Sequence, residues 1–161
     1  MTAQEQLHRL MATPLATPSL QRPKPYRPSQ RQATRIFNIL NQAVFKGHLC
    51  RPTIALGRQV KSLGWCIGQY QPNSYGSYSQ LELSDKYYNV QWFVMVLAHE
   101  MSHQYQWDIV GQQRLRQGRL RPMSHGPSFF KFRQRLEKFG IPLRRRAKID
   151  RWFEYQDFRK L

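Results

Sequence analysis

The sequence predicts a single domain that mixes helices with a small group of strands. Its 161 residues suffice for one domain with a buried core and flexible ends. Apolar residues recur with helical spacing in several segments, and three short β-prone segments lie between the first two of these. The hydrophobic content of 40% and the aromatic content of 13% exclude a wholly disordered chain.

The first half of the domain is predicted to contain one helix and three strands. Ser29 can cap a helix that runs to about Lys46, with Gly47 as its stop. The strand candidates follow Pro52, Gly64 and the turn-forming stretch PNSYG, and they are Thr53–Leu56, Trp65–Tyr70 and Ser79–Leu83.

The second half is predicted to be helical and basic. A helix is expected from about Asn89 to Trp107, where an apolar stripe recurs at helical spacing. Residues 108–124 are expected to form a basic loop, which could include a short helical turn. Pro127 is suited to the start of a further helix, which Gly140 and Pro142 would end.

The ends of the chain differ in composition from this central part. Residues 1–28 are predicted to be a proline-rich arm, residues 29–142 the folded domain, and residues 143–161 a basic, aromatic tail that could form a last helix. The start lacks the pattern of a secretory signal, and no apolar run is long enough to span a membrane. The two cysteines, Cys50 and Cys66, fit neither a CxxC pair nor a disulfide framework. We therefore expect a cytoplasmic protein, near the nucleoid or, if phage-encoded, in the host cytoplasm.

The stretch VLAHEMSHQYQW carries the pattern H-E-x-x-H at His99, Glu100 and His103. Residues four apart share one face of a helix, so both histidines could bind the same metal ion. Glu100 lies beside them and could act on a water molecule as a general base. The pattern falls inside a predicted helix, which is the context that its chemistry requires.

A catalytic zinc site needs a third protein ligand and an open fourth position. The metzincin pattern would place glycine at 106 and histidine at 109, where this chain has Gln106 and Ile109. No acidic residue lies between Asp108 and Glu137, and His125 is the only side chain of ligand type in that interval. His125 is therefore our candidate for the third ligand, with His8 and His48 as less suitable alternatives.

The group that would polarise a substrate carbonyl beside the metal ion is left open by the sequence. Four side chains could do so, and the sequence does not separate them, namely Tyr75, Tyr78, Tyr105 and Arg121.

The net charge of +17 predicts a polyanionic partner, most often nucleic acid. Residues 111–148 contain twelve Lys or Arg residues and one acidic residue, Glu137. A simpler interpretation is a solvated surface that aids solubility. We expect contact with nucleic acid through a set of arginines, namely Arg114, Arg116, Arg119, Arg121, Arg144, Arg145 and Arg146.

The order of these motifs resembles the SprT-like metallopeptidase domain, to which the Spartan-type DNA–protein crosslink proteases belong. The resemblance covers roughly residues 30–142 and rests on NQAVFKGHL, PTIALG, GWCIGQY, SQLELSD, VLAHEMSHQYQW and HGPSFFKF. It implies a zincin-like α+β fold, in which a small three-stranded sheet packs on an active-site helix with flanking helices. It also implies zinc bound by His99, His103 and His125, Glu100 as general base, and cleavage of proteins on DNA.

The region after the catalytic domain departs from this family pattern. Many relatives carry a four-cysteine zinc ribbon there, whereas this sequence has no cysteine after Cys66. The basic cluster and the tail could replace that module electrostatically.

Three functions are compatible with the sequence. The first is a zinc endopeptidase that acts on DNA-bound proteins, and the second is a nucleic-acid-binding or regulatory protein with a purely structural metal site. A third, weaker alternative is a zinc hydrolase of another bond. Glu100 favours an enzyme, since a structural site has no use for a base. In zincins a strand next to the active-site helix pairs with an extended peptide, and Ser79–Leu83 is the candidate for that role.

Overall fold

The computed structural model describes residues 1–12, 25–57, 64–69, 78–87 and 89–145. The helical elements are α1 (Ala3–Ala12), α2 (Gln30–Ala43), α3 (Val90–Gln104), η1 (Tyr105–Gly111), α4 (Gln112–Arg116), η2 (Phe129–Phe132) and α5 (Arg133–Glu137). The strands are β1 (Thr53–Gly57), β2 (Gly64–Gln69) and β3 (Tyr78–Ser84). The mixed α and β character that the sequence predicts is thus confirmed.

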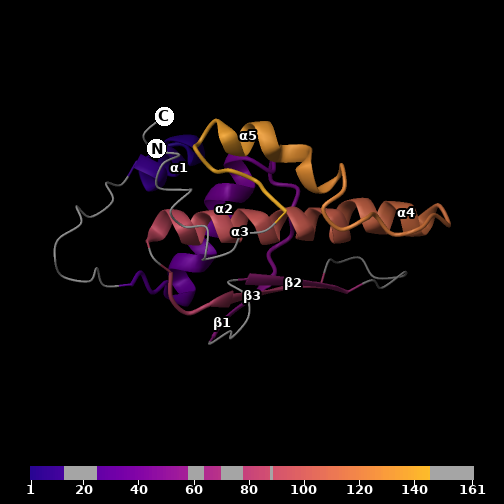
Figure 1. Ribbon diagram of the computed structural model, residues 1–161, viewed down its shortest axis with the longest axis horizontal. Coiled ribbons are helices and arrows are strands. Elements are labelled where there is room, and N and C mark those ends of the chain that lie inside the picture. The colour runs from indigo at the N-terminus through magenta and orange to yellow at the C-terminus, as the bar shows by residue number, and fades with distance from the viewer. Residues whose placement is uncertain (13–24, 58–63, 70–77, 88, 146–161) are drawn as a thin grey trace.

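The described strands form one sheet in the order β1-β3-β2. β1 runs parallel to β3 with Ile54 opposite Leu81, and β2 runs antiparallel to it with Cys66 opposite Leu81. Leu81 and Leu83 are fully buried, as their alternation with polar neighbours predicts. In Figure 1 the sheet lies along one side of α3, and α5 lies along the opposite side.

The strand order corrects the role expected for Ser79–Leu83. This segment belongs to β3, whose two edges are already paired with β1 and β2. A peptide therefore cannot add to β3. Within the described residues, β2 pairs with β3 on one side only, and it packs more extensively on α3 than β3 does.

Helix α2 begins with the cap that the sequence predicts. The Ser29 hydroxyl accepts a hydrogen bond from the Gln32 amide at 3.2 Å, and the Gln32 side chain accepts one from the Ser29 amide at 2.8 Å. Such a reciprocal capping box satisfies two amide groups at the helix start. The helix ends at Ala43, slightly before the predicted end, and Gly47 follows with a φ of 72°. Its buried face includes Ile36, Phe37 and Leu40.

The expectation of a loose N-terminus is wrong for its first residues. α1 packs against α2 and α3, and Leu7 is fully buried. The His8 ring lies 4.6 Å from the Phe139 ring, so His8 is occupied in packing. Residues 13–24, which hold most of the expected proline-rich arm, lie outside the described residues. The domain boundaries at 29 and 142 stay a prediction.

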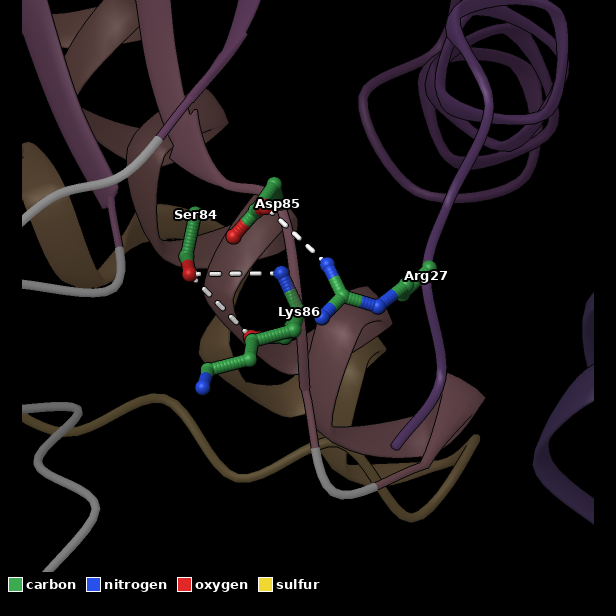
Figure 2. Close-up of polar contacts among 4 residues, drawn as sticks. All are labelled: Arg27, Ser84, Asp85 and Lys86. Atoms are coloured by element: carbon green, nitrogen blue, oxygen red, sulfur yellow. Dashed lines mark hydrogen bonds and ion pairs between the residues drawn. The ribbon is translucent and has the colours of Figure 1, made fainter. Parts of the chain in front are cut away.

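The chain before α2 is tied to the turn after β3. Tyr26 and Tyr87 exchange backbone hydrogen bonds of 2.8 Å, and the Arg27 guanidinium lies 3.0 Å from the Asp85 carboxylate (Figure 2). The same turn is closed by the Ser84 hydroxyl, which donates to the Lys86 carbonyl and accepts from the Lys86 amide (Figure 2). These contacts fix the entry into α3.

Helix α3 begins near the predicted position but the helical path continues further than expected. The Asn89 side chain caps it by accepting a hydrogen bond from the Trp92 amide. After Gln104 the path continues through the π-helix η1 and through α4 to Arg116, so the expected loop at 108–124 is wrong for its first part. The Ser79 hydroxyl donates to the buried Asp108 carboxylate at 2.7 Å and ties η1 to β3. In Figure 1, α4 projects beyond the body of the molecule.

The segment after Pro127 is helical but not one regular helix. It consists of the 3-10 turn η2 followed by α5, and Gly140 ends it with a φ of 73°. Ile141 and Leu143 are buried in the core, so the first residue of the expected tail packs with the domain. The last helix expected in the tail falls on residues 146–161, outside the described part of the chain. Within the described residues, no helix has the length and apolarity that a membrane span requires.

Candidate metal centre

Three histidines converge, two from α3 and one from a later loop. His99 and His103 lie one turn apart on α3, and their ring centroids are 5.0 Å apart. His125 comes from the loop before η2, and its Nε2 atom lies 3.1 Å from Nε2 of His103. One ring nitrogen from each of the three histidines lies within 4.8 Å of the other two, so the cluster could hold a metal ion.

The cluster rests on a buried aromatic ring. Phe129 at the start of η2 is fully buried, and its ring centroid lies 4.9 Å from His99, 4.6 Å from His103 and 4.7 Å from His125. Helical spacing predicts that Phe129 belongs to a buried stripe. Its contact with all three histidines could not be predicted in this way, because it depends on how the His125 loop folds back onto α3.

The loop that carries His125 has an unusual backbone. His125 has a φ of 54°, a left-handed conformation that few residues other than glycine adopt. A Cβ atom at Gly126 would lie 2.9 Å from the Met123 carbonyl oxygen, so only glycine fits there without displacement. The Gly126 amide donates to that carbonyl at 3.0 Å, and the Phe129 amide donates to the Gly126 carbonyl at 2.9 Å. This tight turn explains why glycine follows the histidine.

The two histidines of α3 have hydrogen-bond partners behind the cluster. His99 hydrogen-bonds to the backbone of Arg144. His103 Nδ1 lies 3.1 Å from the Oε1 atom of Gln106, a buried side chain on the next turn. Partners of this kind orient metal-binding imidazole rings. The sequence places Gln106 beside the motif, but only the structure reveals its contact.

Burial and mutual repulsion keep the imidazoles neutral. Desolvation lowers the pKa of His99 to about 3, and positive charge on His103 or His125 would lower it further. Desolvation, followed by the charge of His125, lowers the pKa of His103 to about 4, against a smaller opposing effect of Gln106. The pKa of His125 is also lowered, by desolvation and then by the positive charge of Arg145. Neutral imidazole is the form that binds a metal ion.

Glu100 is buried next to His99 on α3. Burial raises the pKa of Tyr87, and the negative charges of Glu100 and Asp85 add to this, so the Glu100 carboxylate lies within electrostatic reach of Tyr87. Glu100 follows His99 directly on the same helix, and its role as a general base stays a prediction.

The alternative ligands lie away from the cluster. Among the described residues, the metal-ligand cluster consists of His99, His103 and His125. Neither His8 nor His48 belongs to it.

The candidates for polarising a substrate carbonyl differ in their surroundings. Tyr105 is buried, and its hydroxyl accepts a 2.7 Å hydrogen bond from Lys131. Both its ring and its hydroxyl are therefore engaged inside the protein. Arg121 is exposed. Tyr75 and the side chain of Tyr78 lie outside the part of the chain that the structure describes.

The arginines expected to contact nucleic acid fall into two groups. Arg114 is half-buried on α4, whereas Arg116, Arg119 and Arg121 are exposed on α4 and the following loop. Leu120 and Met123 in the same loop are 89% and 72% exposed. Arg145 is exposed and close enough to His125 for its charge to affect that pKa, while Arg144 is half-buried. Arg146 lies outside the described residues.

Comparison with known proteins identifies a family. Comparison with curated proteins and with solved structures gave no significant match. Comparison with protein families matches residues 33–148 to the SprT-like family, and this stretch contains most of α2, the sheet, α3 and all three histidines of the cluster. Because the match spans most of the sequence, this chain belongs to the SprT-like family.

Proposed function

We propose that this chain is a zinc-dependent endopeptidase of the SprT-like type that cleaves DNA-associated proteins. The observation that carries the proposal is the convergence of three neutral imidazoles, two of which lie on the helix that also carries the buried Glu100. A zincin-like arrangement of the active-site helix and its sheet is part of this proposal.

Zinc suits the donor set. Catalytic zinc prefers three protein ligands, and imidazole nitrogens at about 2.0–2.1 Å in tetrahedral geometry lie roughly 3.4 Å apart. The 3.1 Å between the Nε2 atoms of His103 and His125 is close to that separation. Among the described residues, no cysteine or carboxylate joins the three histidines as a fourth ligand. Bound zinc would supply a Lewis acid that polarises the scissile carbonyl and acidifies water.

The chain's own groups would supply the proton transfers and the orientation of the substrate. Glu100 would accept a proton from the attacking water and return it to the nitrogen of the leaving amine. Its burial keeps it poorly solvated. β2 has an edge that β3 does not occupy, and it packs on α3. An extended peptide could add to this edge through backbone hydrogen bonds, as substrates do on edge strands.

Positive charge near the centre supports a substrate held on nucleic acid. Arg116, Arg119 and Arg121 are exposed, and the loop that contains Arg119 and Arg121 leads directly to His125. Arg145 places a further charge close to His125. Contacts between these side chains and phosphates would hold the centre near proteins on the same DNA without selecting a base sequence.

The alternative is a nucleic-acid-binding or regulatory protein in which the metal ion is only structural. The decisive experiment measures zinc content together with proteolysis of several unfolded proteins, with and without DNA. We expect about one zinc per chain and cleavage that DNA enhances. Stoichiometric zinc without any cleavage would favour the alternative, and absence of zinc would overturn both.

A further inference from the structure

Gln106 lies behind the metal centre and hydrogen-bonds to three residues, one on α3 and two on the segment that carries His125. Its side chain is fully buried, with an exposed fraction of 0%. The Nε2 amide donates to the Met123 carbonyl at 2.9 Å and lies 2.9 Å from the Ser128 hydroxyl, to which it also donates. Its Oε1 atom lies 3.1 Å from Nδ1 of His103. Both donors of the amide and its acceptor are therefore used inside the protein.

These contacts fix where the proton of His103 lies. A backbone carbonyl can only accept hydrogen bonds, so the Met123 carbonyl requires the NH₂ group of Gln106 on its side. The oxygen of the amide then faces His103, and it too can only accept. Nδ1 of His103 must therefore carry the proton, which leaves Nε2 with a free lone pair toward the other histidines.

The same amide holds the segment that carries the third histidine. Met123 lies two residues before His125, and its carbonyl accepts from both Gln106 and the Gly126 amide. Ser128 directly precedes Phe129, the ring that contacts all three histidines. The left-handed backbone of His125 needs such support, because it is not an intrinsically favoured conformation.

We propose that Gln106 is a positioning residue of the metal centre, which selects the metal-binding tautomer of His103 and anchors the His125 loop to the helix. This inference rests on the proposed metal binding, and it adds a residue outside the H-E-x-x-H pattern. A neutral amide suits the role because it can accept from an imidazole and donate to a carbonyl at the same time.

The test compares Gln106→Leu with a matched control, Gln104→Leu. Gln104 is likewise a fully buried glutamine two residues earlier, and its Nε2 donates to the Cys50 carbonyl at 2.8 Å, away from the histidines. Zinc affinity is measured by competition with a chelator, and the tautomer of His103 is read from two-bond ¹H–¹⁵N correlations of the metal-free protein. For Gln106→Leu we expect zinc affinity to fall about 10- to 100-fold and His103 to lose its uniform Nδ1–H state. Gln104→Leu should retain the wild-type zinc affinity and tautomer.

A second variant keeps the inference testable if Gln106→Leu does not fold. A carboxylate in Gln106→Glu still accepts from His103 but cannot donate to Met123. We expect the Nδ1–H tautomer to persist while backbone order at 123–126 decreases in NMR relaxation. A changed tautomer in Gln106→Glu, wild-type order of its loop, or an equal decrease of zinc affinity in both leucine variants would each overturn the inference. Failure of the proposed function would give a different result, because the wild-type protein itself would then not bind zinc.

Discussion

One continuous helical path, from α3 through η1 to α4, carries His99 and His103 of the metal centre at one point and leads to a basic end, α4 and the loop to Arg121. These two regions are built in opposite ways. His99 and His103 on α3 are desolvated, neutral and held by hydrogen bonds from behind. Arg116 on α4 and Arg119 and Arg121 in the loop that follows are exposed and permanently charged. Interactions of buried groups are little screened by solvent, whereas those of exposed charges weaken within a Debye length of about 8–10 Å at moderate salt.

This difference predicts that chemistry and placement can be separated by mutation. Changes at the buried centre should abolish metal binding or hydrolysis under all salt conditions. Changes at the exposed end should alter only how the protein meets a polyanion, in a salt-dependent manner.

The largest effect is expected for the third ligand. His125→Ala leaves two imidazoles, and a catalytic zinc site needs three protein ligands. We expect zinc occupancy to fall as far as in His99→Ala, and hydrolysis to be abolished. His48→Ala, which lies outside the cluster, serves as the control. Full zinc and activity in His125→Ala, measured by metal analysis and a peptide assay, would show that the third ligand is misassigned.

The next effect is expected for the base. Glu100→Gln preserves the shape of the side chain but cannot accept the proton, so hydrolysis should fall by at least ~10²-fold. Zinc content should remain that of the wild type, since Glu100 does not belong to the histidine cluster. Single-turnover cleavage of a peptide, measured beside zinc content, distinguishes this result from removal of the metal ion. Turnover at the wild-type rate would contradict the mechanism.

How much of this centre could be predicted depends on how local each signal is. His99 and His103 could be paired because a helix converts spacing into a shared face. His125 could be found because the interval after Asp108 contains no other candidate. The role of Gln106 depends on the Met123 carbonyl and on Ser128, which are distant in sequence, and no propensity encodes such a contact.

The errors in the predicted fold have a similar origin. α4 has the sequence QQRLR, with no buried residue, so it lacks the apolar stripe that would predict a helix. It forms because the helical path of α3 continues through η1. α1 escapes prediction because only Leu7 among its residues is fully buried and a proline-rich segment follows it. Strand order was beyond prediction, since Ser79–Leu83 has the pattern of a strand whether it lies at the edge or in the centre.

A smaller effect is expected for the stability of the metal-free protein at low pH. The pKa values of His99 and His103 are about 3 and 4 in the folded state and near 6.5 in the unfolded chain. Between these values the unfolded chain binds more protons, so the free energy of unfolding should decrease as the pH falls from about 6.5 toward 4. The slope is at most about 1.4 kcal/mol per pH unit for each histidine. Urea titrations at several pH values measure it, and His99→Gln should flatten the curve. An identical slope in that variant would mean that His99 does not cause the pH dependence.

The smallest effect on the chemistry itself is expected at the exposed end. Changing Arg114, Arg116, Arg119 and Arg121 to Gln should leave zinc content unchanged, because none of these side chains belongs to the cluster. Cleavage of a small peptide should also be unchanged, unless Arg121 polarises the substrate carbonyl. If they bind phosphates, DNA affinity should depend less on salt, by about 0.9 in the log–log slope for each duplex phosphate that is no longer neutralised. Cleavage of a DNA-bound protein should decrease accordingly.

The matched control removes the same charge from exposed residues elsewhere, Arg31, Arg35, Lys46 and Arg51. Salt titrations of DNA affinity for the wild type and both variants separate a local contact surface from the effect of net charge. Equal changes in both variants would mean that net charge alone attracts DNA, and no change in either would mean that this end is only a solvated surface.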